Sequence, residues 1–256
     1  MAYINGKETA VNLKVQVISP INPEWTDWQY FSYANNRNEH VAKLKYSDTS
    51  NGTNFSSMFN RCSDLTAIPA LDTSNGTSFF NMFYECSGLT AIPALDTSKG
   101  TNFTQMLYNC SGLTTIPALD TSNGTNFSNM FSRCSGLTTI PALDTSNGTN
   151  FSNMFYKCSS LTAIPALDTS KGTNFSSMFF ECILLVDLNI TGTITASGFN
   201  VQYSPLSHES LMSIINALAD KTGESGTFKI TLGSTNYEKL TAEELEIAEN
   251  KGWEVV

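Results

Sequence analysis

The chain has 256 residues, of which 41% are hydrophobic and only 14% are charged, and its formal net charge is -9 at pH 7. This length allows one large domain, or a repeat array with a small appendage. The acidic balance argues against a nucleic-acid partner, which would require clustered Lys and Arg, and no run approaches the ~18 apolar residues of a membrane span.

The first 23 residues are expected to form an N-terminal extension. Residues 11–20, VNLKVQVISP, alternate like a strand outside the repeats. Polar residues interrupt residues 1–20, so this segment lacks the continuous apolar stretch of a secretory signal. The extension either packs on the segment that follows, which is the simpler interpretation, or attaches the protein to a larger assembly.

Residues 48–191 contain six copies of a 24-residue unit, D-T-S-N-G-T-N-F-S-N-M-F-x-x-C-S-G-L-T-x-I-P-A-L. The last copy decays after its cysteine, where ILLVDLNIT follows. A fixed period of this length predicts a solenoid, in which each unit packs only on its neighbours. A degenerate copy at 24–47 keeps the apolar positions Phe31, Val41 and Leu44, and we interpret it as the capping repeat that such an array needs.

Within one unit the hydrophobic pattern changes from helical to extended. Residues 127–134 carry apolar side chains at i, i+3, i+4 and i+7, which favours a short helix with a Thr or Asn N-cap that ends at Gly136. Residues 137–143, LTTIPAL, are typical of a strand, which its proline limits to three or four paired residues. DTSNG at 144–148 is a turn in which glycine supplies a positive φ. The predicted fold is α/β, a right-handed leucine-rich-repeat solenoid with one short parallel strand and one short helix per repeat.

The frame N-M-F-x-x-C-S-G-L-T-x-I-P-A-L-D-T-S-N resembles the leucine-rich repeats of bacterial surface proteins called BspA-like. The resemblance covers about 48–191 and departs in having Ile-Pro within the strand. It implies a function in adhesion and host contact, at a bacterial cell surface or on a phage or prophage virion. The opening MAYINGKE is similar to the starts of phage tail and baseplate proteins. An extracellular location would require either a leader absent from this chain or another route of release.

Residues 192–256 are expected to form a C-terminal cap with a β-α-β-like order. An amphipathic helix at 207–221 begins with a Ser N-cap, and TFKITLGS at 227–234 alternates like a strand. A second helix begins with Thr241, has Glu in its first turn and ends near Gly252. A final strand follows.

The six cysteines are predicted to be reduced thiols in the core rather than three disulfides. Each follows the helical Phe and Met positions by one more helical step, and stacked copies about 4.8 Å apart would not fit disulfide geometry. These residues are Cys62, Cys86, Cys110, Cys134, Cys158 and Cys182. Zinc is disfavoured because the chain has no C-x-x-C pair and only two histidines, His40 and His208.

We expect no enzymatic activity, cofactor or metal. The sequence has no nucleophile elbow, phosphate-binding loop or metal motif. The row of aspartates could bind calcium. We favour a structural role, because each unit supplies only one carboxylate and that carboxylate can accept hydrogen bonds from the N–H groups of its own turn.

Recognition is the remaining function, and only the two positions before each cysteine vary freely between copies. Tyr and Arg, which dominate binding hot spots, are frequent there, and Tyr84 and Tyr108 should align about 5 Å apart. The alternative is that these side chains only solvate the exterior. The candidate binding residues are Tyr84, Glu85, Tyr108, Asn109, Arg133, Tyr156 and Lys157.

Two functional hypotheses follow. The leading one is a non-enzymatic adhesion module that binds a host or cell-surface protein or glycan, with no nucleic-acid partner and no membrane insertion. The other is a structural spacer in a larger phage or surface assembly, with no ligand of its own.

Overall fold

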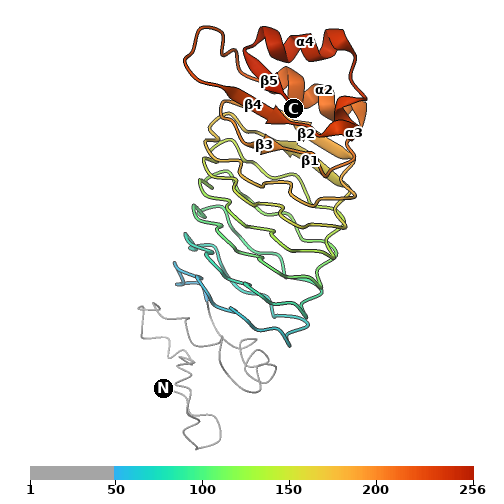
Figure 1. The fold of residues 1–256 in the computed structure, drawn as a ribbon. Helices are drawn as coiled ribbons and strands as arrows, with labels where there is room; N and C mark the ends of the chain where they lie inside the picture. Colours follow the sequence, from blue (N-terminus) through green and yellow to red (C-terminus); the bar gives the residue numbers. More distant parts are fainter. Residues whose placement is uncertain (1–48) are drawn as a thin grey trace, which may run out of the picture.

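The computed structural model describes residues 49–256 (Figure 1). The predicted extension at 1–23 and the predicted capping repeat at 24–47 lie outside the described residues. Figure 1 shows the repeats as flat coils of chain stacked on one another, with the helices gathered at the C-terminal end.

Consecutive copies of the unit stack in parallel and in register. Isolated parallel bridges join the same position of successive copies, from Asn54 and Ser78 through Asn102 and Asn126 to Asn150 and Asn174. The period read from the sequence is therefore the period of the structure. The described residues form a mixed α/β, repeat-type fold without a closed barrel.

The predicted helix in each repeat is wrong. Residues 128–133 form turns, and Asn129 and Arg133 adopt φ values of 56° and 63°, which no right-handed helix contains. The N–H groups of the segment alternate between two partners: that of Met130 donates to Phe127 O in its own copy, whereas that of Phe131 donates to Met154 O in the next. Apolar residues spaced as on a helix thus belong to a segment that bonds its neighbours like a strand.

The asparagine predicted as an N-cap has a related role in a turn. Oδ1 of Asn126 accepts a hydrogen bond from the N–H of Ser128 at 3.0 Å, and Asn102 and Asn150 do the same for the residues two positions on. These Asx turns begin the turn segment, so the residue preference was correct although no helix follows.

Regular strands are rare in the repeats, as the prolines predict. β1 (Ala163–Leu167) pairs in parallel with β2 (Asp187–Ile190), with a register shift between Ile164 and Leu167. Between the other described copies, the equivalent extended segments are joined only by a bridge between Thr139 and Ala163 and by single backbone hydrogen bonds. Each proline lacks the N–H donor that a continued ladder requires.

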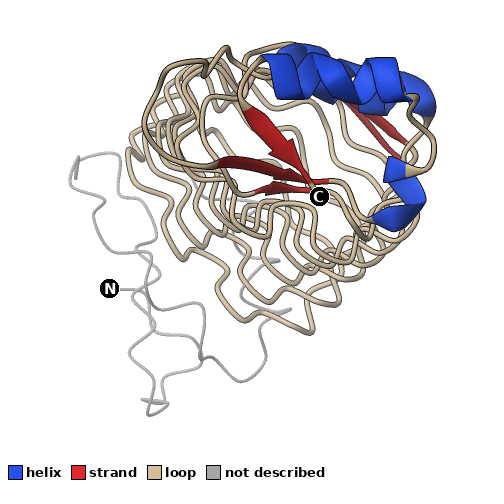
Figure 2. Cartoon of the chain, turned by 45° about the horizontal axis from the view of Figure 1, so that its top comes forward, coloured by secondary structure: helices blue, strands red, loops and turns tan. Residues whose placement is uncertain are grey.

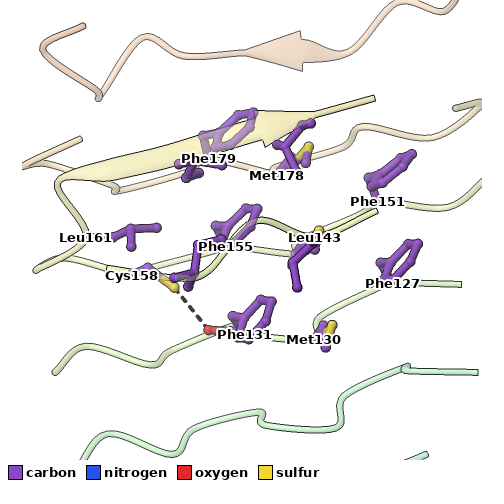
Figure 3. Close-up of a cluster of buried hydrophobic side chains, with 14 of the residues drawn as sticks. Phe127, Met130, Phe131, Leu143, Phe151, Phe155, Cys158, Leu161, Met178 and Phe179 are labelled. Carbon is purple, nitrogen blue, oxygen red and sulfur yellow. Dashed lines mark hydrogen bonds between the residues drawn. The ribbon is translucent and has the colours of Figure 1, made fainter. Parts of the chain in front are cut away.

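The core is a set of ladders of identical or similar side chains. Phe127 and Phe151 stack with ring centroids 5.7 Å apart, and Phe131 and Phe155 stack at 5.5 Å (Figure 3). Methionines such as Met130 and the Leu and Ile of the extended segment complete the buried interior. A fully buried Phe, Leu, Ile or Met contributes roughly 1.5–3 kcal/mol, so each added copy extends a continuous core.

The glycine of each DTSNG turn is required by space rather than by a positive φ, which corrects the prediction. Among the described residues, glycines with positive φ occur only at 198 and beyond. A Cβ on Gly100 would lie 2.6 Å from Cζ of Phe103 and 2.9 Å from the carbonyl oxygen of Thr97. Gly112, predicted to end a helix like its equivalent Gly136, instead lies against the carbonyl oxygens of Ser87 and Leu89.

The C-terminal cap has the predicted elements and two further ones. Observed as predicted are α2 (His208–Ala217) behind the N-cap Ser207, β4 (Phe228–Thr231), α4 (Ala242–Asn250) with a capping box at Thr241, and β5 (Trp253–Val255). The additional elements are β3 (Phe199–Asn200) and the short helix α3 (Ser234–Tyr237).

Strands β3, β4 and β5 form a parallel sheet in that order, which closes the stack beside the helices (Figure 2). Helix α2 covers the edge of β2: Ser210 Oγ accepts the N–H of Leu188 at 2.8 Å, and Ser213 Oγ donates to Leu188 O at 3.1 Å. The helix hydroxyls thus replace the repeat that would otherwise come next. Across 49–256, no helix is long and apolar enough to span a membrane.

Candidate binding surface

The two positions before each cysteine form a surface that we call the outer column. Its first positions are Asn60, Tyr84, Tyr108, Ser132, Tyr156 and Phe180, and its second positions are Arg61, Glu85, Asn109, Arg133, Lys157 and Glu181. All of these residues are exposed or half-buried except Ser132, which is 1% exposed. The structure therefore brings all seven predicted binding residues onto one continuous ladder.

The aromatic rings of the outer column form two stacks. Tyr84 and Tyr108 are nearly parallel, with centroids 4.6 Å apart and an interplanar angle of 6°, which confirms the predicted alignment. Tyr156 stacks on Phe180 at 5.2 Å, and Tyr203 of the cap meets Phe180 edge-on at 4.9 Å. Ser132 separates the two stacks.

An arginine stands at the start of each stack, and sequence reasoning missed this pairing. The Arg61 guanidinium lies 5.9 Å from the Tyr84 ring centroid, and that of Arg133 lies 5.9 Å from Tyr156. In both cases the copy that supplies the arginine has Asn60 or Ser132 at its first position. The sequence does contain a sign of this pairing, because in the outer column Arg follows only the non-aromatic first positions. Where a copy has no ring, its cation can lie on the ring of the next copy instead.

Charged side chains of neighbouring copies also pair along the column. Arg61 Nε lies 3.2 Å from Glu85 Oε2, and Lys157 Nζ lies 3.4 Å from Glu181 Oε2. Exposed pairs of this kind contribute at most about 1 kcal/mol. Burial and, after it, the Glu85 carboxylate raise the pKa of Tyr84, so its hydroxyl stays protonated at neutral pH.

The backbone of the outer column does not depend on which side chains it carries. The second positions all have positive φ, and in the first five copies their N–H groups donate to carbonyls of the next copy, as Arg133 does to Tyr156 O at 2.7 Å. Residues as different as Arg, Glu, Asn and Lys occupy this conformation. The repeat therefore fixes where these side chains start and leaves their chemistry free to vary.

The six cysteines are free and buried, as predicted. The Cys158 thiol donates to Phe131 O at 3.0 Å (Figure 3), and Cys134 does the same to Leu107 O. Burial raises the pKa of Cys134 and of Cys182 to about 12. A thiol that stays protonated and enclosed serves neither as nucleophile nor as metal ligand.

The aspartates that begin the second to sixth copies are engaged by their own turns. Asp144 Oδ1 accepts the N–H of Ser146 at 3.0 Å and its hydroxyl at 2.7 Å. These bonds lower the pKa of Asp144, and the equivalent bonds to Ser98 lower that of Asp96. Within 49–256, no three His, Cys, Asp or Glu side chains are grouped so as to hold a metal ion.

A second exposed surface was not predicted. Ile183, Leu184 and Val186 of the sixth copy are 54%, 51% and 41% exposed. The replacement of the consensus by ILLV was visible in the sequence, but only the structure shows that three of these side chains face outward and one, Leu185, faces the core.

The parallel stack of 24-residue copies defines a repeat protein whose exposed side chains change from copy to copy. The chain belongs to the family described as Mycoplasma protein of unknown function, DUF285, which matches residues 28–139 and, in a second overlapping match, 89–190. No curated protein and no solved structure is significantly similar to the chain.

Proposed function

We propose that the protein is a non-enzymatic binding module that uses its outer column to contact a protein or glycan of a host or another cell. The repeats would form a right-handed leucine-rich-repeat solenoid of the BspA-like kind, displayed at a bacterial cell surface or on a virion. The observation that carries the proposal is the pair of aromatic stacks, because the fold accepts many residue types at the positions that form them.

The composition of the outer column supports recognition. Tyrosine offers a large rigid apolar surface together with a hydroxyl, and Tyr and Arg are enriched among residues that dominate binding energy. Here they occur together, because Arg61 and Arg133 lie on the rings of Tyr84 and Tyr156. Each stack is thereby held in one arrangement before a ligand arrives, which reduces the entropy lost on binding.

The alternative is a structural spacer, which the continuous core favours. The Phe ladder from Phe55 to Phe175 makes the stack a rigid rod, and a rod can separate two parts of a particle without binding anything. The spacer hypothesis predicts that changes in the outer column have no effect on function.

A binding screen separates the two hypotheses. The full chain is tested on an array of host glycans and extracellular-matrix proteins, and each ligand found is titrated against Tyr84→Ala/Tyr108→Ala/Tyr156→Ala. We expect at least about a tenfold loss of affinity, as for the loss of clustered hot-spot residues. A matched control replaces three exposed threonines on another surface, Thr90→Ala/Thr114→Ala/Thr138→Ala. Equal affinity of the tyrosine variant and the wild type would refute the assignment of the column.

A further inference from the structure

The sixth copy departs from the repeat at three positions whose side chains are exposed in this copy. The preceding copy has Ser159, Ser160 and Thr162 where the sixth has Ile183, Leu184 and Val186. The earlier copies have only Ser, Asp, Gly or Thr at the same places. The core residues Leu185 and Leu188 keep their buried positions, so the three exposed apolar side chains are additions to the surface.

These residues adjoin the end of the outer column. Tyr203, 45% exposed, contacts the ring of Phe180, and four residues later the N–H of Ser207 donates to Val186 O at 2.8 Å. The loop 203–207 therefore runs from the last ring of the column to the departing segment. We call the surface made by Phe180, Ile183, Leu184, Val186 and Tyr203 the terminal patch.

Several exposed apolar residues gathered on one surface usually mark an interaction site. Single exposed apolar residues are common on proteins and need no explanation. Here three occur within four positions and two aromatic rings border them. The departure from a sequence that the chain otherwise repeats with little change makes the terminal patch a specific feature of this end of the stack.

The charges beside the terminal patch are mainly acidic. Glu181 precedes it, Asp187 follows Val186, and Glu209 lies in the first turn of α2 just after Ser207. Lys157 pairs with Glu181, so these two charges largely offset each other, whereas Lys239, whose Nζ donates to Leu206 O at 2.6 Å, keeps its positive charge. Asp187 and Glu209 together outweigh it. His208 pairs with Glu244. The potential around the patch therefore favours a cationic partner.

Ile, Leu and Val offer no hydrogen-bonding group, so the terminal patch suits apolar side chains better than a sugar. We propose that it docks a polypeptide segment of a partner protein, in which apolar residues are flanked by Lys or Arg. The proposal rests on the binding function proposed above and narrows its ligand to a protein. The segment would place its apolar side chains on Ile183 and Leu184 and its cations beside Asp187 and Glu209.

A peptide selection tests the proposal. A library of random 12-residue peptides displayed on phage is selected against the full chain, and the enriched peptides are synthesised and titrated by fluorescence anisotropy. We expect peptides that combine aliphatic residues with Lys or Arg. Ile183→Ser/Leu184→Ser/Val186→Thr should lower their affinity at least about tenfold, as expected when clustered anchors are lost. This variant installs the residues of the preceding copy, so the repeat itself accommodates them.

Two further variants complete the test. Asp187→Asn/Glu209→Gln should weaken the same peptides and reduce the salt dependence of their binding, because exposed charges act through a screened potential. Ser159→Ala/Ser160→Ala/Thr162→Ala changes the same positions of the fifth copy and serves as the matched control, with affinity expected to stay unchanged. Circular dichroism and urea unfolding confirm that each variant is folded.

Three outcomes would overturn the proposal. The first is that no peptide is enriched, or that the enriched peptides lack apolar and basic residues. The second is that the peptides bind the Ile183→Ser/Leu184→Ser/Val186→Thr variant as tightly as the wild type. The third is a wild-type dimer in sedimentation experiments that dissociates in this variant, which would identify a second copy as the occupant. If one of these outcomes is found while the tyrosine variant still loses glycan or matrix-protein binding, the outer column is retained and only the terminal patch is rejected.

Discussion

At the scale of single residues, the invariant glycine of the turn that begins each repeat, DTSNG or DTSKG, shows how tightly neighbouring copies approach. A Cβ on Gly100 would meet the side chains of Phe103 and Phe79 and the backbone of Thr97. Because the backbone atom cannot rotate away, Gly100→Ala should lower the free energy of unfolding by about 1–3 kcal/mol, the usual range for overpacking. Urea denaturation measures this change.

The neighbouring residue provides the control for Gly100. Lys99 is exposed, and its Nζ donates to Asn75 Oδ1 at 2.6 Å. Lys99→Ala should change the free energy of unfolding by no more than about 0.5 kcal/mol, as for most surface substitutions. Equal effects of the two substitutions would contradict the steric role of the glycine.

The buried thiols make stability depend on pH in the alkaline range. An unfolded cysteine has a pKa of about 8.5, whereas burial raises the pKa of Cys134 and Cys182 to about 12 and that of Cys110 and Cys158 well above its usual value. Between these values the unfolded chain binds fewer protons than the folded one, so stability falls as pH rises. The stability that the buried, protonated thiols contribute is fully present below about pH 8.5 and is lost progressively as the pH rises toward 12.

Urea unfolding at pH 7, 9 and 10 with a reductant tests this dependence. Other groups also titrate in this range, so the comparison is made with Cys134→Ala/Cys158→Ala. The variant is less stable at every pH because it contains cavities, but its stability should fall less steeply, by at most about 1.4 kcal/mol per pH unit for each thiol removed. Parallel slopes for the two proteins would show that these thiols do not stay protonated in the fold.

At the scale of elements, the sequence predicted the cap better than the repeat. The helices α2 and α4 carry their own signals, namely a Ser or Thr cap and an amphipathic face, and both form as expected. The segment 127–134 has the spacing of a helix but forms turns, because half of its N–H groups donate to the next copy. Periodicity describes which side chains are buried, and it does not identify the partner of each backbone group.

The contact between the repeats and the cap depends on hydroxyls of α2. Ser210 is buried, and its Oγ accepts the N–H of Leu188 on β2. Ser210→Ala would leave this donor unpaired, so the free energy of unfolding should fall by about 1–3 kcal/mol. Hydrogen exchange should show the largest loss of protection in β2 and α2. The exposed Glu209→Ala at the preceding position serves as the control, and equal exchange in β2 for Ser210→Ala and the wild type would contradict the capping role.

At the scale of the whole molecule, the fold is a sum of nearly identical interfaces, and this explains which surfaces could be found from the sequence. The outer column was predicted because it varies against a constant background. The terminal patch was missed because the apolar residues that replace the consensus in the sixth copy could equally have been buried in the core of the cap. Only the structure shows that Ile183 and Leu184 are exposed and that Leu185 is buried. The pairing of Arg133 with Tyr156 was missed because it joins residues of two different copies.

Such a stack should shorten by one copy without other change. Deletion of residues 120–143 removes one 24-residue period and joins two equivalent positions, so every ladder re-forms. The variant should fold, with an urea m-value lower by roughly a tenth, since m scales with the surface exposed on unfolding. It also removes Ser132 and Arg133, so Tyr108 should stack directly on Tyr156 and unite the two aromatic stacks. Deletion of 120–131, half a period, displaces every buried column and should prevent folding; similar unfolding curves for the two deletions would contradict the modular stack.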